Sequence, residues 1–449
     1  MLKKYSHLLL WSLLFCSTLS NAQINQFEWG LPAGDRNWFN GIKLITADTA
    51  GNVFITGPHY ELGNLSIGDT SLPLAVGDMF TAKIDKTGHT EWVRTSTGIT
   101  GSTPLPYSIT SDTKGDCYIV GLVSGTTTFH GVTIGAPNDE VFVIKINKDG
   151  NLDWGTSFAG NGQFLYHKLN CVAIHNGSLR IGGSGGVFYT KIDTIDGSIQ
   201  YQTTGIQALE ATRIATDNQG NNYFLDTDAS LVPDTIGGLI YTPTGPFSSI
   251  IVKQDSVGNS IWVKEFSSNF HYLNDIEIDN SGNIYILGAV GDSLQLDGNT
   301  FIKNYNINPL YAIYSSFIAK FDSSMNIIWT QEIGNFDFGA FTDTTFLDLE
   351  LDLAGNLYAA SAFSNGYWVG NHQVTVPNNA ETSLVTKLNS KGSIIWVKQI
   401  EGYRNTPRAI AVSPEGVYLY GECFNGIANF NNQPLGLSSS FITKLTNEG

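Results

Sequence analysis

Residues 45–57 read ITADTAGNVFITG and residues 80–92 read FTAKIDKTGHTEW, and these two segments decide the fold. Each segment alternates apolar and polar residues on both sides of a turn rich in Gly, Asp and Asn, which is typical of a β-hairpin. The first segment recurs as ITSDTKGDCYIVG, VAIHNGSLRIGG, IATDNQGNNYFLD, IEIDNSGNIYILG, LELDLAGNLYAAS and IAVSPEGVYLYG. The second recurs as FVIKINKDGNLDW, FYTKIDTIDGSIQY, IIVKQDSVGNSIW, FIAKFDSSMNIIW, LVTKLNSKGSIIW and FITKLTNEG.

The repeat has a regular period. Its turn glycines are Gly51, Gly115, Gly177, Gly220, Gly282, Gly355 and Gly416, and its lysines are Lys83, Lys145, Lys191, Lys253, Lys320, Lys387 and Lys444. The mean spacing is about 61 residues, which is enough for four short strands and their connections. No region after residue 22 has a helical pattern. Units of four strands predict an all-β, seven-bladed β-propeller with four-stranded blades.

The two ends of the chain complement each other. The last lysine segment stops at Gly449, where the other copies continue to a Trp, and the missing strand is found near the N-terminus as INQFEWGLPAG. We therefore expect the strand with Trp29 to join the last blade and close the ring. Closure of the ring would remove the exposed sheet edges of an open repeat array.

Taken together, the two segments resemble the seven-bladed β-propeller repeat (SBBP-type) of exported bacterial proteins, in which a FVAKLD..G...W segment alternates with a DN.IAVD..GNVYVTG segment. The resemblance covers nearly all of residues 23–449. It implies a secreted or surface protein and no single activity. The third unit departs from the pattern, with Tyr201 in place of the Trp and a short GGSGG in place of a longer insertion.

One aromatic residue recurs per unit at the end of the second segment. We expect these side chains to fill the wedge between neighbouring blades, where the gap is widest. The repeated lysines are expected to lay their stems along the blade with the ammonium in water. Trp38 lies outside the repeat, in a connection between blades, and is the candidate exposed aromatic for ligand binding.

The composition excludes several classes of protein. Of 449 residues 42% are hydrophobic and only 14% are charged, which is unlike a disordered tail or a coiled coil. The formal net charge of −16 makes binding to nucleic acid or to an anionic membrane surface unfavourable. We expect a monomer that has no nucleic-acid partner and no membrane span.

The N-terminus predicts export. Lys3 and Lys4 precede a short apolar run, and SNA at residues 20–22 provides small residues at a cleavage site. We therefore expect residues 1–22 to be a cleaved signal peptide and residues 23–449 to be a single propeller domain, located in the periplasm, at the cell surface or outside the cell. Cleavage would leave Cys117, Cys171 and Cys423, and whether any two of them pair stays open.

The candidate binding site lies on the first strand of each unit, which lines the axis of a propeller. The alternation of the strands turns Asp275, Glu277, Asp348 and Glu350 toward the inner rim, with Arg213 beside them. Four neighbouring carboxylates repel one another unless they are solvated, protonated, paired with Arg or bridged by a cation. We predict a site for a cation or a cationic ligand, with Asp275 and Asp348 as the metal ligands if the cation is calcium. A water-filled channel with solvated carboxylates is the simpler alternative.

The function class remains open among three possibilities. The first is a non-enzymatic binding module for an extracellular protein or glycan, because rigid scaffolds carry function on their connections. The second is a carbohydrate-active hydrolase or lyase that uses the inner-rim carboxylates, and the third is a structural envelope protein. No catalytic residue is assigned, and no cofactor other than calcium is suggested.

Overall fold

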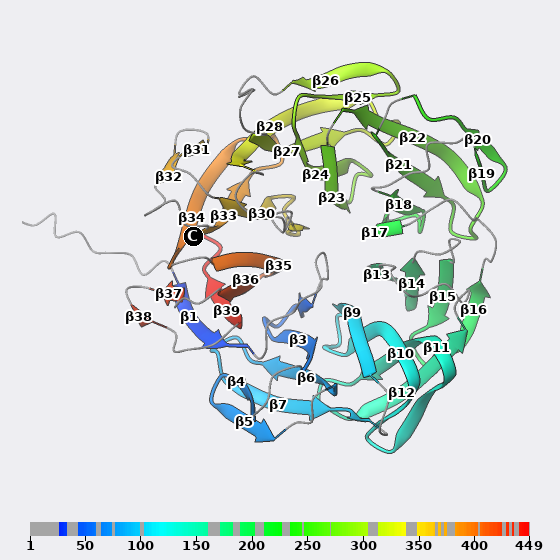
Figure 1. Cartoon of the computed structure of the whole chain (residues 1–449), viewed down its shortest axis with the longest axis vertical. Helices are drawn as coiled ribbons and strands as arrows, with labels where there is room; N and C mark the ends of the chain where they lie inside the picture. The colour runs from blue at the N-terminus through cyan, green and yellow to red at the C-terminus, as the bar shows by residue number, and fades with distance from the viewer. Residues whose placement is uncertain are drawn as a thin grey trace, which may run out of the picture.

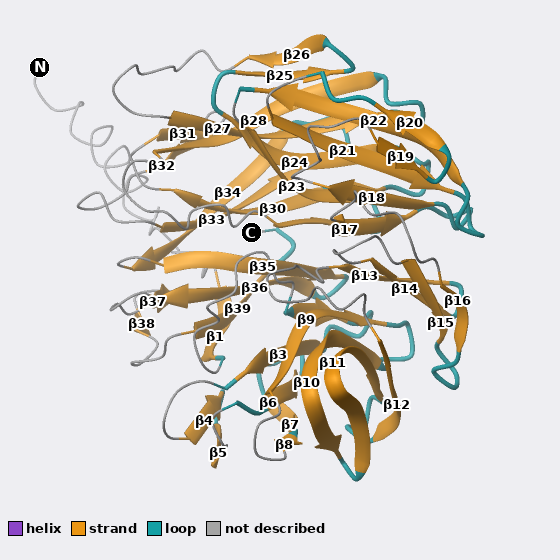
Figure 2. Ribbon diagram, turned by 45° about the vertical axis from the view of Figure 1, so that its right-hand side comes forward, coloured by secondary structure: helices purple, strands orange, loops and turns teal. Residues whose placement is uncertain are grey.

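The structure is a computed structural model of the chain. It describes residues 27–33, 44–59, 64–73, 77–98, 103–159, 171–182, 189–202, 211–226, 234–244, 247–269, 271–303, 313–337, 348–363, 367–369, 372–374, 382–402, 405–423, 428–430, 433–434 and 440–448. The predicted signal peptide and Trp38 lie outside these ranges. Within them the chain forms strands and turns and no helix (Figure 2), and so none that could span a membrane.

Seven antiparallel sheets are arranged around a central axis, which confirms the predicted seven-bladed β-propeller (Figure 1). Blade 1 consists of β2 (Ile45–Ala47), β3 (Val53–Pro58), β6 (Met79–Ile84) and β7 (Thr90–Thr95). Blade 2 consists of β9 (Thr103–Ser111), β10 (Cys117–Phe129), β11 (Val132–Ile146) and β12 (Leu152–Ala159). Blade 3 consists of β13 (Cys171–His175), β14 (Ser178–Gly182), β15 (Tyr189–Asp193) and β16 (Ile199–Gln202).

The remaining four blades repeat this order from the axis outward. Blade 4 consists of β17 (Ala211–Thr216), β18 (Asn222–Asp226), β21 (Phe247–Gln254) and β22 (Ser260–Ser268). Blade 5 consists of β23 (His271–Ile278), β24 (Ile284–Val290), β27 (Ile313–Phe321) and β28 (Ile327–Asp337). Blade 6 consists of β29 (Asp348–Leu351), β30 (Leu357–Phe363), β33 (Thr382–Leu388) and β34 (Ile394–Gly402). Blade 7 consists of β35 (Asn405–Ser413), β36 (Gly416–Cys423), β39 (Ser440–Leu445) and β1 (Phe27–Pro32).

The N-terminal strand closes the ring, as the sequence predicts. Strand β1 lies beside β39 and pairs with it (Figure 1), and the register places Trp29 opposite Lys444. The Thr443 hydroxyl donates to the carbonyl of Trp29 at 2.7 Å. Blade 7 therefore joins both ends of the described chain, and unfolding of either end must open the ring.

The turn between the first two strands of a blade is fixed by a side chain. In blade 1 the Asp48 carboxylate accepts the backbone N–H of Ala50 and of Asn52, each at 2.9 Å, and the Asn52 amide donates back to it at 2.7 Å. Gly51 follows with a φ of +84°, a conformation that a residue with a Cβ rarely adopts. The Asp-x-x-Gly spacing of the repeat thus has a direct geometric cause.

Neighbouring blades are joined through the recurring tryptophan, which confirms its predicted place in the wedge between blades. In five blades the indole N–H donates to a backbone carbonyl in a turn of the next blade. The donor and acceptor pairs are Trp29 with Lys86, Trp92 with Lys148, Trp154 with Thr194, Trp329 with Ser390 and Trp396 with Asn447, at 3.1 to 3.4 Å.

The prediction that the recurring lysines hold their ammonium groups in water is wrong. Lys83, Lys145, Lys320 and Lys444 are only 4 to 9% exposed. The Lys320 ammonium lies 4.7 Å from the centre of the Tyr285 ring and 3.4 Å from the Asp279 carboxylate. A buried ammonium needs a partner of opposite charge, and the turn aspartate provides it.

Short hairpins inserted between the second and third strands lie outside the ring. They are β4 (Asn64–Ile67) with β5 (Thr70–Pro73), β19 (Asp234–Ile236) with β20 (Leu239–Tyr241), β25 (Ser293–Leu296) with β26 (Asn299–Lys303), β31 (Tyr367–Val369) with β32 (His372–Val374), and β37 (Ala428–Phe430) with β38 (Gln433–Pro434). In blade 2 the hairpin is continuous with β10 and β11, and β8 (Thr97–Gly98) pairs with it.

Several of these hairpins extend the sheet of the preceding blade. Strand β25 belongs to the chain of blade 5 but pairs with β22 of blade 4, and β37 of blade 7 pairs in the same way with β34 of blade 6. These backbone hydrogen bonds connect successive blades at the outer wall, in addition to the tryptophan contacts. The ring is therefore held together from its outside.

A buried histidine at the junction of blades 4 and 5 makes stability depend on pH. The His271 ring lies between the hydroxyls of Ser249 and Ser268, each 2.8 Å from a ring nitrogen. Burial lowers the pKa of His271 from 6.5 to about 4, against the opposing effect of Asp292 and Glu265. In the unfolded chain the same imidazole binds a proton at a higher pH.

We predict that acidification from pH 6.5 to pH 4 destabilises the protein by up to about 3 kcal/mol through this residue alone, because the unfolded state binds more protons in that range. The measurement is the free energy of unfolding in urea across this range for the parent and for His271→Gln, with the exposed His372→Gln as control. The His271→Gln profile should be flatter than both others. Parallel profiles of all three proteins would contradict the prediction.

Candidate functional site

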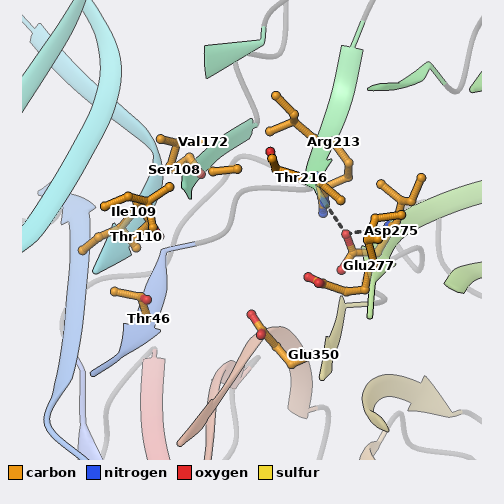
Figure 3. Close-up of a pocket in the computed structure, with 16 residues that line it drawn as sticks. Thr46, Ser108, Ile109, Thr110, Val172, Arg213, Thr216, Asp275, Glu277 and Glu350 are labelled. Atoms are coloured by element: carbon orange, nitrogen blue, oxygen red, sulfur yellow. Dashed lines mark hydrogen bonds and ion pairs between the residues drawn. The ribbon is translucent and has the colours of Figure 1, made fainter. Parts of the chain in front are cut away.

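A central cavity of about 270 Å³ lies on the axis, between the first strands of blades 1 to 6. Its charged wall comes from blades 4, 5 and 6 and its opposite, hydroxyl-bearing wall comes from blades 1 and 2. The side chains that define these walls are Arg213, Asp275, Glu277 and Glu350 on the first and Thr46, Ser108 and Thr110 on the second. Figure 3 shows the carboxylates of Glu277 and Glu350 pointing into the open space between the walls.

The strand register explains which acids reach the cavity. Glu277 lies opposite Tyr285 and Glu350 lies opposite Tyr358, so both occupy the same position in neighbouring blades. Both side chains are half-buried. They stand next to each other on the rim, where a ligand that enters along the axis meets them together.

Asp275 has a different environment. Its side chain is only 4% exposed. One carboxylate oxygen accepts the backbone N–H of Leu349 in blade 6 at 2.8 Å, and the other lies 3.3 Å from Nε of Arg213 in blade 4 (Figure 3). Asp275 therefore links blades 4, 5 and 6, and its charge is compensated where it is buried.

Asp348 repeats this role one blade further on. Its carboxylate accepts the backbone N–H of Ile410 in blade 7 at 2.7 Å, and the side chain is 2% exposed. Asp348 does not line the cavity, in contrast to the predicted placement on the inner rim. The reason is that the neighbouring first strand covers this row of positions, as it also covers Leu44 and Ala409.

The structure thus brings together four of the six predicted site residues. Arg213, Asp275, Glu277 and Glu350 line one cavity, Asp348 lies behind it, and Trp38 is outside the described residues. Strand alternation also places the threonines and the serine of the opposite wall on the inner rim, but the sequence did not mark them as ligand-binding residues. The same period of two that selects the acids also selects these hydroxyls.

The predicted calcium site has a poor set of ligands. In the part of the chain that the structure describes, no group of three or more His, Cys, Asp or Glu side chains could hold a metal ion. Asp275 and Asp348 accept backbone N–H groups instead. Since calcium takes six to eight oxygen ligands, these two residues do not fit the ion as a pair, and calcium binding stays a prediction.

A second cavity, of about 310 Å³, opens on the face that carries the short turns. It lies between blades 6, 7 and 1 and is lined by Ala47, Leu351 and Val412 together with the turn residues Leu353 and Pro414, among others. Leu353 is 83% exposed. Sequence reasoning missed this cavity, because turns from both ends of the chain form it.

Comparisons with known proteins show no family for this chain. No family model matches the sequence, and curated proteins give no match either. Among solved structures, the chain is similar to one in the crystal structure of a mitotic checkpoint complex, with 9% identity, a TM-score of 0.47 and 95% of each chain covered. It is also similar to Chaetomium thermophilum Raptor, with 9% identity, a TM-score of 0.43, and 94% of this chain and 29% of that one covered.

A third similar structure is that of YCF48 bound to D1 peptide, with 10% identity, a TM-score of 0.41, and 93% of this chain and all of that one covered. At these identities the likeness concerns the fold alone. The assignment as a seven-bladed propeller rests on the strand pairing of this chain itself.

We predict that Asp275→Asn lowers the free energy of unfolding by about 1–3 kcal/mol, because Arg213 loses its counter-charge and the N–H of Leu349 loses a charged acceptor. Glu350→Gln, which removes a charge from the half-buried cavity wall, should change stability by no more than about 0.5 kcal/mol. Denaturation in urea measures both. Equal stability of Asp275→Asn and the parent would show that the carboxylate does not join the blades.

Proposed function

We propose that this chain is an exported, non-enzymatic β-propeller that binds a protein or a glycan, and that the ligand places a cationic group in the axial cavity. The observation that carries the proposal is the pair of carboxylates, Glu277 and Glu350, on one wall of a cavity whose other wall carries hydroxyls. We also propose that the chain belongs with the seven-bladed repeat proteins exported by bacteria, on the repeat and the N-terminal segment described above.

The size of the cavity limits the group that enters it. At about 270 Å³ it lies just below the range of roughly 300–1,000 Å³ that holds a drug-sized ligand. A single ammonium or guanidinium group with a short stem matches this volume, whereas a whole oligosaccharide does not. The ligand is therefore a larger molecule that contacts the rim and inserts one group.

Electrostatics favour a cation at this position. The chain carries a net charge of −16, so its long-range field attracts cationic ligands. Asp275 is paired with Arg213, and the carboxylates of Glu277 and Glu350 point into the cavity (Figure 3). The hydroxyl of Thr46 on the opposite wall adds an acceptor for the N–H groups of the ligand.

Because the ring is rigid, we expect the protein to bind its ligand without a change in its own conformation. The first strands are held by Asp275 and Asp348 across three blade junctions, and the outer wall is held by the indole contacts. A preformed site loses little conformational entropy when the ligand enters.

We expect calorimetric titration of residues 23–449 with a pentalysine peptide to give saturable binding. Glu277→Gln/Glu350→Gln should weaken it by at least about tenfold, because both compensating charges are lost. Asp69→Asn/Asp196→Asn removes two exposed charges elsewhere and serves as the matched control. Equal weakening by both double variants would show that only the net charge of the protein matters, and would contradict the proposal.

Two further arms of the experiment separate the alternatives. In the first, a panel of neutral oligosaccharides is incubated with the parent and with Glu277→Gln/Glu350→Gln, the cavity variant. Cleavage by the parent alone would show that the protein is a carbohydrate-active enzyme and not a binding module. In the second, thermal melts in EDTA and in millimolar calcium are compared, since a ligand at a hundredfold excess over its Kd stabilises the native state by about 2.7 kcal/mol. Stabilisation by calcium that is lost in the cavity variant would identify the cation as the metal.

A further inference from the structure

Blade 3 departs from the other blades in charge as well as in its aromatic residue. In blades 1, 2, 4, 5 and 6 the turn residue is an Asp, the second strand carries an aromatic ring and the third strand carries a lysine; blade 7 differs only in having Ser413 at the turn. In blade 3 the turn residue is His175, the second-strand residue is Arg180 and the third-strand residue is Lys191. We call these three residues the blade 3 cationic cluster.

The strand register confirms that these positions are equivalent. In blade 3 Ala173 lies opposite Arg180, Arg180 opposite Lys191, and Lys191 opposite Tyr201. The matching series in blade 5 is Glu277, Tyr285, Lys320 and Trp329. Arg180 and Lys191 thus face each other directly across two paired strands, a placement in which like charges are destabilising.

The lysine has an acidic partner in most of the other blades. The ion pairs are Lys83 with Glu91 at 2.8 Å, Lys145 with Asp116 at 2.9 Å, Lys253 with Asp217 at 4.0 Å, Lys320 with Asp279 at 3.4 Å, and Lys444 with Glu28 at 2.7 Å. Within the described residues no ion pair joins Arg180 or Lys191 to a carboxylate. The three positions that supply this acid in other blades hold His175, Ser178 and Gln200 in blade 3.

Arg180 is buried without adequate compensation. It is 3% exposed, its Nε has no hydrogen-bond partner, and its Nη1 reaches only the carbonyl of His175, at 3.5 Å. An uncompensated buried charge costs several kcal/mol in general. A guanidinium in this state needs an acceptor that the described chain does not supply.

Nearby carboxylates are already engaged. Asp193 accepts the N–H of Ile195 and the side-chain amide of Gln200, each at 2.8 Å. Asp217 of blade 4 accepts the amide of Asn221 at 2.8 Å and the hydroxyl of Tyr223 at 3.2 Å. Burial together with Arg180 and Lys191 lowers the pKa of His175, against the opposing effect of Asp217.

We propose that the blade 3 cationic cluster binds a tetrahedral oxyanion, sulfate or phosphate, either as the free ion or as an ester on a larger ligand. Arg180 offers N–H donors in a planar fork that suits oxyanions, and Lys191 adds a second charge from the neighbouring strand. Asn176 and Gly177 of the adjoining turn are exposed and His175 is half-buried, so the oxyanion reaches the cluster from the face with the short turns. This site is separate from the axial cavity and takes a ligand of opposite charge.

The test compares the parent with His175→Asp/Arg180→Tyr, which gives blade 3 the Asp and Tyr of blades 4, 5 and 6. Thermal melts are recorded in sodium sulfate, sodium phosphate and sodium chloride at equal ionic strength. We expect sulfate and phosphate to raise the Tm of the parent, relative to chloride, by more than they raise the Tm of the variant, because the general stabilisation by these salts acts on both proteins and specific binding acts on the parent alone. In chloride the variant should melt at a higher temperature than the parent, because the facing cations are gone.

A second pair of variants keeps the test decisive if the first does not fold. Lys191→Gln should weaken sulfate binding, measured by calorimetry, by at least about tenfold. Lys320→Gln removes the equivalent, ion-paired lysine of blade 5 and should leave the Kd for sulfate unchanged. Equal responses of parent and variants to all three salts, or equal effects of the two lysine substitutions, would overturn the proposal.

The source of the oxyanion is decided by titration with a sulfated disaccharide, its unsulfated form and inorganic sulfate. Binding of the sulfated sugar that is much tighter than that of inorganic sulfate identifies an ester on a larger ligand, and equal affinities identify the free ion. Equal binding of the sulfated and unsulfated sugars would show that the cluster does not recognise the oxyanion.

Discussion

The contact between a tryptophan and the turn of the next blade is the interaction on which the ring depends. The Trp92 indole donates to the carbonyl of Lys148 and lies against Gly150, where an added Cβ would come within 3.0 Å of the ring. The glycine is required twice, by this close approach and by its φ of +82°. In blade 5 the position of this turn glycine is occupied by Met325. Its φ is +66°, and its side chain packs in the cluster that also contacts Trp262. Blades 1, 2, 5, 6 and 7 each donate an indole hydrogen bond to a turn of the next blade. Blade 3 has Tyr201 at the equivalent position, and its ring lies against Gly258 in a turn of blade 4.

The contacts between blades at the outer wall determine how closely the first strands approach one another at the axis. With the blades fixed from outside, the first strands approach closely, and one row of inner positions is covered by the neighbouring strand. Asp275 and Asp348 fall in this row, and their carboxylates accept backbone N–H groups of the next blade. Glu277 and Glu350 fall in the adjacent row and remain half-buried at the cavity. Two acids that are two residues apart on the same first strand therefore have different roles. The first, Asp275 or Asp348, joins neighbouring blades, and the second, Glu277 or Glu350, faces the axial cavity.

The seven copies also serve as internal controls for one another. A lysine under an aromatic ring is stable in blade 5 because Asp279 lies 3.4 Å away. The same lysine position in blade 3 has Arg180 opposite it and His175 in place of the acid. Such a departure is informative because the backbone register is the same and only the chemistry differs. The two proposed sites, at the axial carboxylates and at the blade 3 cationic cluster, are of opposite charge on one scaffold.

The sequence by itself determined the fold, the number of blades and the closure of the ring by Trp29, because a period of two within strands and a period of about 61 residues between blades are local patterns. It also selected Arg213, Glu277 and Glu350, since alternation along a strand decides which side chains turn inward. It did not reveal that Asp348 is covered, that four of the lysines are buried, or that Arg180 has no acidic partner among the described residues. Those outcomes depend on how closely one blade approaches the next, and that distance is set by contacts between residues far apart in the chain, which only the tertiary structure brings together.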